Sequence, residues 1–185
     1  LHGGNKGYDK VYWNIEKQAG DSSLKLSYTS PDGEEGYPGT LKMEVIYTLT
    51  SANELKIDYS ASTDKATPIN LTSHAYFNLS AGADSTILGH ELMMKAAQYT
   101  PVDSTLIPTG NIEAVTGGPM DFNTAKLIGR DIANVPGGYD HNWVLNRSGT
   151  GLQLAAKLVH PASGRVMEVF RSEERRVGKE CTIQC

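Results

Sequence analysis

Hydrophobic and polar residues alternate along several short stretches of this 185-residue chain. From position 41 to 49 every second residue is apolar, and the alternation resumes at 55–59 after a mostly polar interval. Such alternation places one side of an extended chain on an apolar core and leaves the other side in solvent. The pattern therefore predicts a β-hairpin formed by residues 41–49 and 55–59.

Similar patterns predict further strands at 11–15 and 24–28, with a turn at Pro31-Asp32-Gly33. Residues 152–159 and 165–169 flank a short loop and predict a second hairpin. Helical spacing is not sustained over 10–12 residues anywhere, and 19 Gly and 8 Pro interrupt the chain. The sequence therefore predicts an all-β protein, a sandwich or a barrel, because each one-sided sheet must cover its apolar face.

Two regions depart from this strand pattern. Residues 100–142 are rich in Pro and Gly and predict a long loop region, of the kind that is often functional. From 171 to 185 the chain has seven charged residues, no aromatic residue and no alternation, and its sequence resembles the translation of a common sequencing adapter. We therefore expect a partial β-sandwich domain at 1–169 and a non-native tail at 170–185.

Composition excludes some classes of function. Hydrophobic residues make up 39% of the chain, charged residues 21%, and no apolar run approaches the ~20 residues that span a bilayer. The formal net charge of −4 argues against a nucleic-acid partner. The sequence starts without a Met or a signal-peptide pattern, so it leaves the compartment, cytoplasmic or periplasmic, undetermined. It does not indicate the oligomeric state either.

Residues 69–79 offer the most informative candidate chemistry. If they form a strand, one face is apolar and the other presents hydrogen-bonding side chains, namely Asn70, Thr72, His74, Tyr76 and Asn78. Such a face is a plausible floor for a polar ligand such as a sugar, although an ordinary solvated strand face is the alternative. His74 can exchange a proton near neutral pH, whereas a lone His is more often structural.

Two other segments gather polar groups and aromatic residues. Residues 1–7 place His2 among three glycines, which suits a turn where backbone approaches a ligand. Residues 139–143 combine Asp140 and His141 with two aromatic residues, which suits either a sugar subsite or a capped loop with a buried Trp143. The histidines lack metal-ligand spacing and no serine elbow occurs, so we expect neither a metal site nor a serine nucleophile.

Taken together, six segments in the same order resemble the galactose mutarotase (aldose 1-epimerase) family. They are residues 1–13, 36–39, 70–79, 100–110, 119–122 and 138–142. The resemblance implies a large antiparallel β-sandwich, incomplete here, with an aldose sugar as its small-molecule partner. It also implies a reaction that needs no metal or organic cofactor, in which acid and base groups open the sugar ring and exchange the anomers.

The resemblance also assigns roles to single residues. His74 corresponds to the family's general acid toward the ring oxygen, and we expect it to be catalytic. His2 and Asp140 are expected to hold sugar hydroxyls, with Tyr76 beside the ring. Asn78 and His141 are expected to support these residues.

The family pattern is incomplete in this sequence. Its general base is a glutamate downstream of the Asp140 motif, and its sugar-binding arginine precedes the His2 motif; neither is identified here. We therefore expect a chain truncated at both ends and inactive by itself. Two other readings stay open, a non-catalytic carbohydrate-binding β-sandwich and a purely structural β-domain.

Overall fold

The computed structural model describes residues 3–17, 22–146 and 148–172. Within these ranges the regular structure is antiparallel β-strand with four short 3-10 helices, and no α-helix is present. None of the described helices is long and apolar enough to cross a membrane. The prediction of an all-β, antiparallel protein is confirmed. The chain divides into two compact units, Leu1–Leu71 and Thr72–Cys185.

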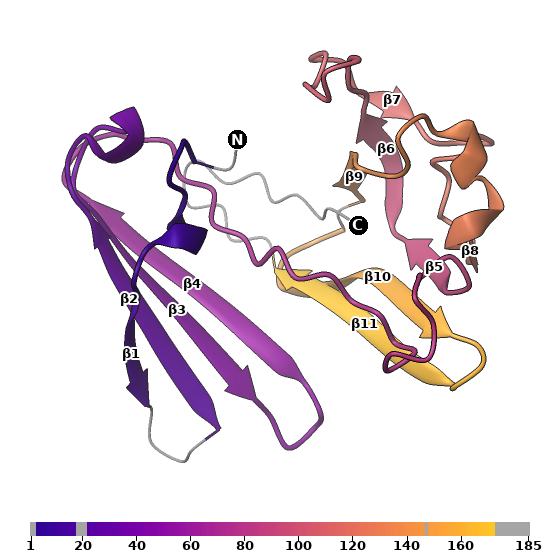
Figure 1. The fold of residues 1–185 in the computed structure, drawn as a ribbon, viewed down its shortest axis with the longest axis horizontal. Helices are drawn as coiled ribbons and strands as arrows, with labels where there is room; N and C mark the ends of the chain where they lie inside the picture. Colours follow the sequence, from indigo (N-terminus) through magenta and orange to yellow (C-terminus); the bar gives the residue numbers. More distant parts are fainter. Residues whose placement is uncertain (1–2, 18–21, 147, 173–185) are drawn as a thin grey trace. The chain divides into compact units, whose positions relative to one another are not determined.

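The first unit is a four-stranded antiparallel sheet in the order β1-β2-β3-β4 (Figure 1). Its strands are β1 (Asn14–Lys17), β2 (Ser23–Ser30), β3 (Leu41–Leu49) and β4 (Leu55–Thr63), accompanied by the 3-10 helices η1 (Tyr8–Lys10) and η2 (Glu34–Gly36). β3 and β4 are paired along their length, with Leu49 opposite Leu55 at one end and Leu41 opposite Thr63 at the other, which confirms the first predicted hairpin. The first strand begins only at Asn14. Just before it, Trp13 donates its indole N–H to the Tyr8 carbonyl at 2.9 Å.

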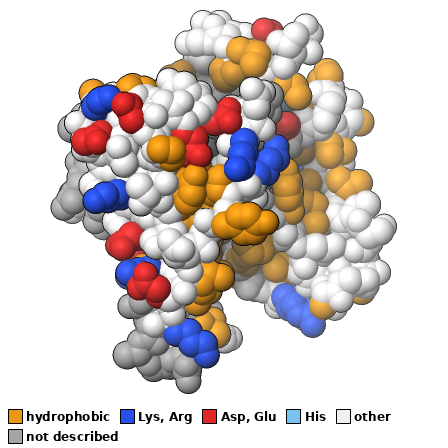
Figure 2. Space-filling model, turned by 60° about the vertical axis from the view of Figure 1, so that its left-hand side comes forward, with side chains coloured by type: hydrophobic (Ala, Val, Ile, Leu, Met, Phe, Trp, Pro, Cys, Tyr) orange, Lys and Arg blue, Asp and Glu red, His pale blue; other side chains and the backbone are white. Residues whose placement is uncertain are grey.

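The register of this sheet separates an apolar face from a polar one. Leu26, Val45 and Tyr59 lie opposite one another across three strands, whereas the intervening Lys25 forms an ion pair with Glu44. Burial follows the same alternation along β3, where Leu41, Met43 and Val45 are buried. Part of the apolar face remains open, since Leu49 and Leu55 are mostly exposed. Figure 2 shows other hydrophobic side chains at the surface of one face of the molecule.

The second unit contains two antiparallel sheets. One has the strand order β11-β10-β5-β8 and the other β7-β6-β9 (Figure 1). The strands are β5 (Glu91–Met94), β6 (Ala96–Thr100), β7 (Glu113–Ala114), β8 (Lys126–Leu127), β9 (Asn142–Leu145), β10 (Leu152–His160) and β11 (Arg165–Ser172). The 3-10 helices η3 (Ile128–Arg130) and η4 (Ile132–Asn134) lie between β8 and β9. β10 and β11 are paired along their length, with His160 opposite Arg165 at one end and Leu152 opposite Ser172 at the other, which confirms the second predicted hairpin.

The core of the second unit is built around aromatic residues from its loops and from β9. Phe122, Tyr139 and Trp143 pack with ring centroids 5.2–6.1 Å apart. The buried Trp143 also donates its indole N–H to the Met120 carbonyl at 3.0 Å. The predicted loop region at 100–142 is therefore mostly irregular but ordered by packing, because its apolar side chains insert into the core.

Residues 69–79 do not form the predicted strand. They run as an irregular segment between β4 and β5, and residues 72–78 are all exposed (Figure 1). The prediction was wrong because alternation reveals which side chains share a face but not whether a neighbouring strand is present. Without a paired strand in the described structure, no ladder of backbone hydrogen bonds forms here. The expected apolar backing is also missing, since Phe77 is half exposed.

The chain end predicted to be a non-native tail lies mostly outside the described residues. β11 extends to Ser172, so Phe170 and Arg171 pair with Leu154 and Gln153 of β10. Residues 173–185 are not described, and the assignment of a tail at 170–185 stays a prediction.

The aromatic core predicts a large effect of truncation. Phe122 is 1% exposed and contacts both Tyr139 and Trp143, so Phe122→Ala is expected to lower the free energy of unfolding of the second unit by about 3–5 kcal/mol. Trp143 fluorescence during urea unfolding, measured in a Trp13→Phe background, reports on this unit. Phe170→Ala is the control, because this phenylalanine is about half exposed and its loss is expected to cost far less. Equal losses in the two variants would contradict the assignment of the core.

Candidate functional site

His74 and Tyr76 lie together on the exposed segment that precedes β5. Their ring centroids are 5.2 Å apart with an interplanar angle of 48°. Both side chains are exposed, and Tyr76 is 83% accessible. The imidazole and the phenol, two positions apart on an irregular chain, are therefore in contact.

Asn78 forms a turn directly after these two residues. Its amide Nδ2 donates to the Asp84 carbonyl at 2.9 Å, and its Oδ1 accepts the Ser80 N–H at 2.9 Å. The hydroxyl of Ser80 in turn accepts the Asp84 N–H at 3.0 Å. Asn78 therefore stabilises the turn after the segment through a local side-chain and backbone network.

Asp140 stands at the end of the loop that leads into β9. The adjacent glycines 137 and 138 have φ of 80° and 83°, conformations that side chains other than glycine rarely adopt. After them, the Tyr139 hydroxyl donates to the Pro119 carbonyl at 3.1 Å. This contact holds the backbone next to Asp140, whose own side chain is exposed.

The ring of His141 is packed from two sides. Its centroid lies 5.9 Å from Tyr99 and 6.4 Å from Trp143, both in edge-on geometry. Burial lowers the pKa of His141, partly opposed by the negative charge of Asp140. Its Nδ1 and the neighbouring Asn142 Oδ1 are buried without a hydrogen-bond partner among the described atoms. His141 is thus a packing element of the chain beside Asp140.

His2 lies outside the described residues, but the turn that follows it is visible. Gly3 and Gly4 have φ of 101° and 112°, and a Cβ at Gly4 would lie 2.1 Å from Glu35 Oε2. The Glu35 carboxylate accepts the Asn5 N–H at 2.6 Å and the Lys6 N–H at 3.1 Å. The glycines therefore allow this carboxylate to hold the turn, a role that the prediction from composition alone did not include.

Of the four residues predicted for the site, the structure places three in the second unit. His74 and Tyr76 are in contact, and Asp140 stands on the loop before β9. His2 precedes a turn of the first unit. Within the described ranges, no group of three His, Cys, Asp or Glu side chains is arranged to hold a metal ion.

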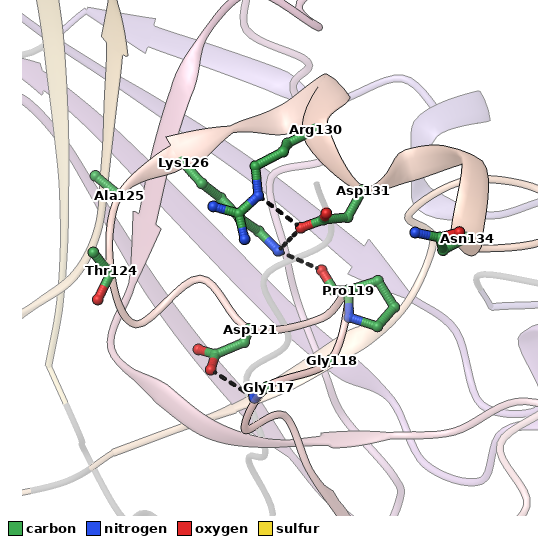
Figure 3. Close-up of a pocket in the computed structure, with 10 residues that line it drawn as sticks. All are labelled: Gly117, Gly118, Pro119, Asp121, Thr124, Ala125, Lys126, Arg130, Asp131 and Asn134. Carbon is green, nitrogen blue, oxygen red and sulfur yellow. Dashed lines mark hydrogen bonds and ion pairs between the residues drawn. The ribbon is translucent and has the colours of Figure 1, made fainter.

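A polar hollow of about 300 Å³ lies elsewhere in the second unit, between β8, η3 and the loop that contains Pro119 (Figure 3). At its base is Lys126, whose side chain is 3% exposed. The ammonium donates to the Pro119 carbonyl and to Asp131 Oδ2, both at 2.7 Å, and lies 4.3 Å from the centroid of the Phe122 ring. Arg130 Nε also donates to Asp131, at 3.1 Å.

The charges around the hollow are compensated by these contacts. The hydrogen bond from Lys126 is the main cause that lowers the pKa of Asp131. Backbone N–H groups of Gly117 and Asn123 lower the pKa of Asp121. The Lys126 ammonium is already bonded to two oxygens and covered by the Phe122 ring. Its contacts therefore link the loop that contains Pro119 to the turn that contains Asp131. Sequence reasoning missed it, because a single Lys beside apolar residues gives no sign of burial.

Comparisons with known proteins relate this chain to one family. The sequence model of the family described as aldose 1-epimerase matches residues 1–177. Proteins named galactose mutarotase from Sus scrofa and Homo sapiens are 42% and 43% identical over 174 residues, which cover 94% of this chain and 50% of each relative. The aldose 1-epimerase of Escherichia coli K12 is 40% identical over 84% of this chain and 46% of its own length.

Solved structures show the same likeness. A GalM/aldose epimerase homologue from C. elegans has a TM-score of 0.75 at 29% identity, covering 85% of this chain and 48% of that one. A galactose 1-epimerase from Lactobacillus acidophilus NCFM has a TM-score of 0.75 at 31% identity, with 85% and 47% covered. The chain spans about half the length of the curated relatives that it matches.

The buried ion pair predicts a dependence of stability on acid. A pKa of Asp131 that is lower in the folded state stabilises the protein above the ordinary carboxyl value of ~3.9, and this contribution is lost as the pH falls through the lowered pKa. Asp131→Asn is therefore expected to lower the urea midpoint at neutral pH and to flatten its fall in acid. Glu168→Gln, which breaks the exposed pair with Lys157, is the control and should change little. Parallel acid profiles for Asp131→Asn and the unmodified chain would contradict this assignment.

Proposed function

The chain belongs to the aldose 1-epimerase family, and we propose that the protein interconverts the α and β anomers of aldohexoses such as glucose and galactose. The observation that supports this most strongly is the family match over residues 1–177, combined with an exposed His74 beside Tyr76. An imidazole ionises near neutral pH, which suits a group that must both give and take a proton during turnover.

Anomer exchange requires two proton transfers. A base removes the proton from the C1 hydroxyl while an acid protonates the ring oxygen, so the bond between C1 and the ring oxygen breaks and a free aldehyde forms. Rotation about the C1–C2 bond followed by closure, with both protons returned, gives the other anomer. Atoms and electrons balance without an oxidant, and the acid side of this exchange is the role proposed for His74.

The remaining site residues are proposed to hold the sugar. Tyr76 lies against His74, so its ring can border the sugar ring, and the Asp140 carboxylate can accept hydrogen bonds from hydroxyl groups. His2 is proposed to contribute from the glycine turn held by Glu35. His141 and Tyr139 would keep Asp140 in place, because both are packed against Trp143.

The base is not identified among these 185 residues. The family resemblance places it on a glutamate downstream of the Asp140 motif. The loss of one member of an acid and base pair typically lowers the rate by ~10² to 10⁴. We therefore propose that this polypeptide alone contributes the acid and part of the sugar site but not catalysis. A non-catalytic sugar-binding domain would use the same exposed residues and differs in needing no base.

Polarimetry of freshly dissolved α-glucose and α-galactose tests the chain by itself. Mutarotation is expected at the rate of buffer, because a concerted acid and base reaction lacks its base. The fluorescence of Trp13 and Trp143, recorded in parallel with increasing sugar, reports whether sugar binds. A rate far above that of buffer would refute the inactivity of the chain. A complete lack of sugar-dependent change would favour a purely structural domain.

A chimera tests the role of His74. Residues 1–172 of this chain would replace the matching half of the galactose mutarotase of Sus scrofa, with which the chain shares 42% identity. His74→Asn in that chimera is expected to lower kcat by ~10² to 10⁴. Ser73→Ala, a neighbouring exposed position, is the control and should keep the rate. If His74→Asn retained full kcat in a folded chimera, this histidine would not be the acid.

A further inference from the structure

His90 is the most deeply buried titratable side chain of the described part of the second unit. It lies directly before β5 and is 0% exposed. Its Nε2 accepts the backbone N–H of Leu79 at 3.0 Å. Because an amide N–H can only donate, Nε2 must present its lone pair, and the ring proton of the neutral imidazole then resides on Nδ1.

Both polar groups of Leu79 are held by side chains from distant parts of the sequence. His90 takes the N–H, and Arg165 Nη1 donates to the Leu79 carbonyl at 3.3 Å. Leu79 ends the exposed segment and follows His74 by five positions. These two bonds fix the backbone at the end of the exposed segment, in place of the missing strand ladder.

A second histidine supports the first. The rings of His90 and His160 are stacked with centroids 4.7 Å apart and an interplanar angle of 30°. His160 is also buried; its Nε2 lies 2.9 Å from Asp84 Oδ2 and its Nδ1 2.8 Å from the Ser163 hydroxyl. Since the Asp84 backbone bonds to Asn78 and Ser80, the histidine stack joins both ends of the turn after His74.

The electrostatics of the stack favour a neutral His90. Burial lowers the pKa of His90, the positive charge that His160 can take lowers it further, and the carboxylate of Asp84 opposes both. Protonation would turn Nε2 into a donor facing the Leu79 N–H, so the contact would break. Arg165, the other charged group at Leu79, adds a positive charge near the same peptide.

We propose that His90, supported by His160, is a positioning residue for His74: it fixes the Leu79 peptide and thereby the path of the segment that bears the general acid. The catalytic consequence rests on the proposed function, whereas the structural dependence of His74 on His90 does not. A buried histidine that merely fills the core would leave His74 unaffected when it is replaced.

Nuclear magnetic resonance of the labelled 185-residue chain without sugar tests this dependence. His90→Leu removes the acceptor, and we expect at least a tenfold faster exchange of the Leu79 amide together with shifted ring signals of His74 and Tyr76. His90→Gln offers an amide oxygen near the place of Nε2. This variant is expected to restore most of the protection of the Leu79 amide and most of the original ring signals of His74 and Tyr76. Val115→Ala, a buried change with no bond to Leu79, serves as the control for general loss of stability.

Two results would overturn the proposal. One is a His90→Leu chain whose Leu79 exchange and His74 signals match those of Val115→Ala. The other is a wild-type ring of His90 that carries its proton on Nε2 at neutral pH, as read from its nitrogen chemical shifts. If His90→Leu fails to fold, the tautomer in the unmodified chain and the restored contact in His90→Gln still decide the matter.

The effect of pH provides a readout that packing alone would not give. Because the pKa of His90 is lowered on folding, its contribution is complete above the ordinary histidine value of ~6.5 and is lost as the pH falls through the lowered pKa. Protection of the Leu79 amide should therefore fall in this window in the unmodified chain and stay flat in His90→Gln. Equal pH profiles would contradict the proposal.

Adding α-galactose to the same samples separates this inference from the proposed function. His74 signals that depend on His90 but do not respond to sugar would refute a sugar site in this chain and leave the positioning role intact. His74 signals that respond to sugar but do not depend on His90 would refute the positioning role and leave the proposed sugar site intact.

Discussion

The second unit depends on buried side-chain donors that satisfy the carbonyls of one loop. Trp143 donates to the Met120 carbonyl, and both Tyr139 and Lys126 donate to the Pro119 carbonyl. A buried carbonyl without a partner costs free energy comparable to a lost hydrogen bond, so these three contacts allow irregular backbone to enter the core. The loop before β9, and Asp140 with it, is held by the same contacts.

The segment that bears His74 is organised by the same principle. It has no strand ladder in the described structure, and side chains hold its end at Leu79 and the turn that follows. The segment that bears His74 and the loop that bears Asp140 are thus both irregular backbone, held by hydrogen bonds from side chains of other segments. This arrangement leaves His74 exposed while the His90 ring that binds Leu79 stays buried.

The sequence predicted the elements that local pattern defines. Alternation at 41–49 and 55–59 identified a hairpin, because both partners lie close together in the chain. The same pattern failed at 69–79, since it cannot show whether a distant strand pairs there. The burial of His90 and Lys126 was not predicted either, because each is a single polar residue and the alternation of polar and apolar positions gives no sign that it is buried. The polar patterns at 69–79 and 139–143 pointed to His74, Tyr76 and Asp140 as candidates, whereas their specific roles came from the family resemblance and stay predictions.

The two histidines of the stack differ in what surrounds them, and this difference defines their roles. His160 meets an acceptor in Asp84, so a positive charge on its ring is compensated. His90 meets a donor in the Leu79 N–H, so a charge on its ring is opposed. The Nε2 atom of His90 can therefore accept the Leu79 N–H only while it carries no proton, and the proposed positioning of the His74 segment depends on this bond.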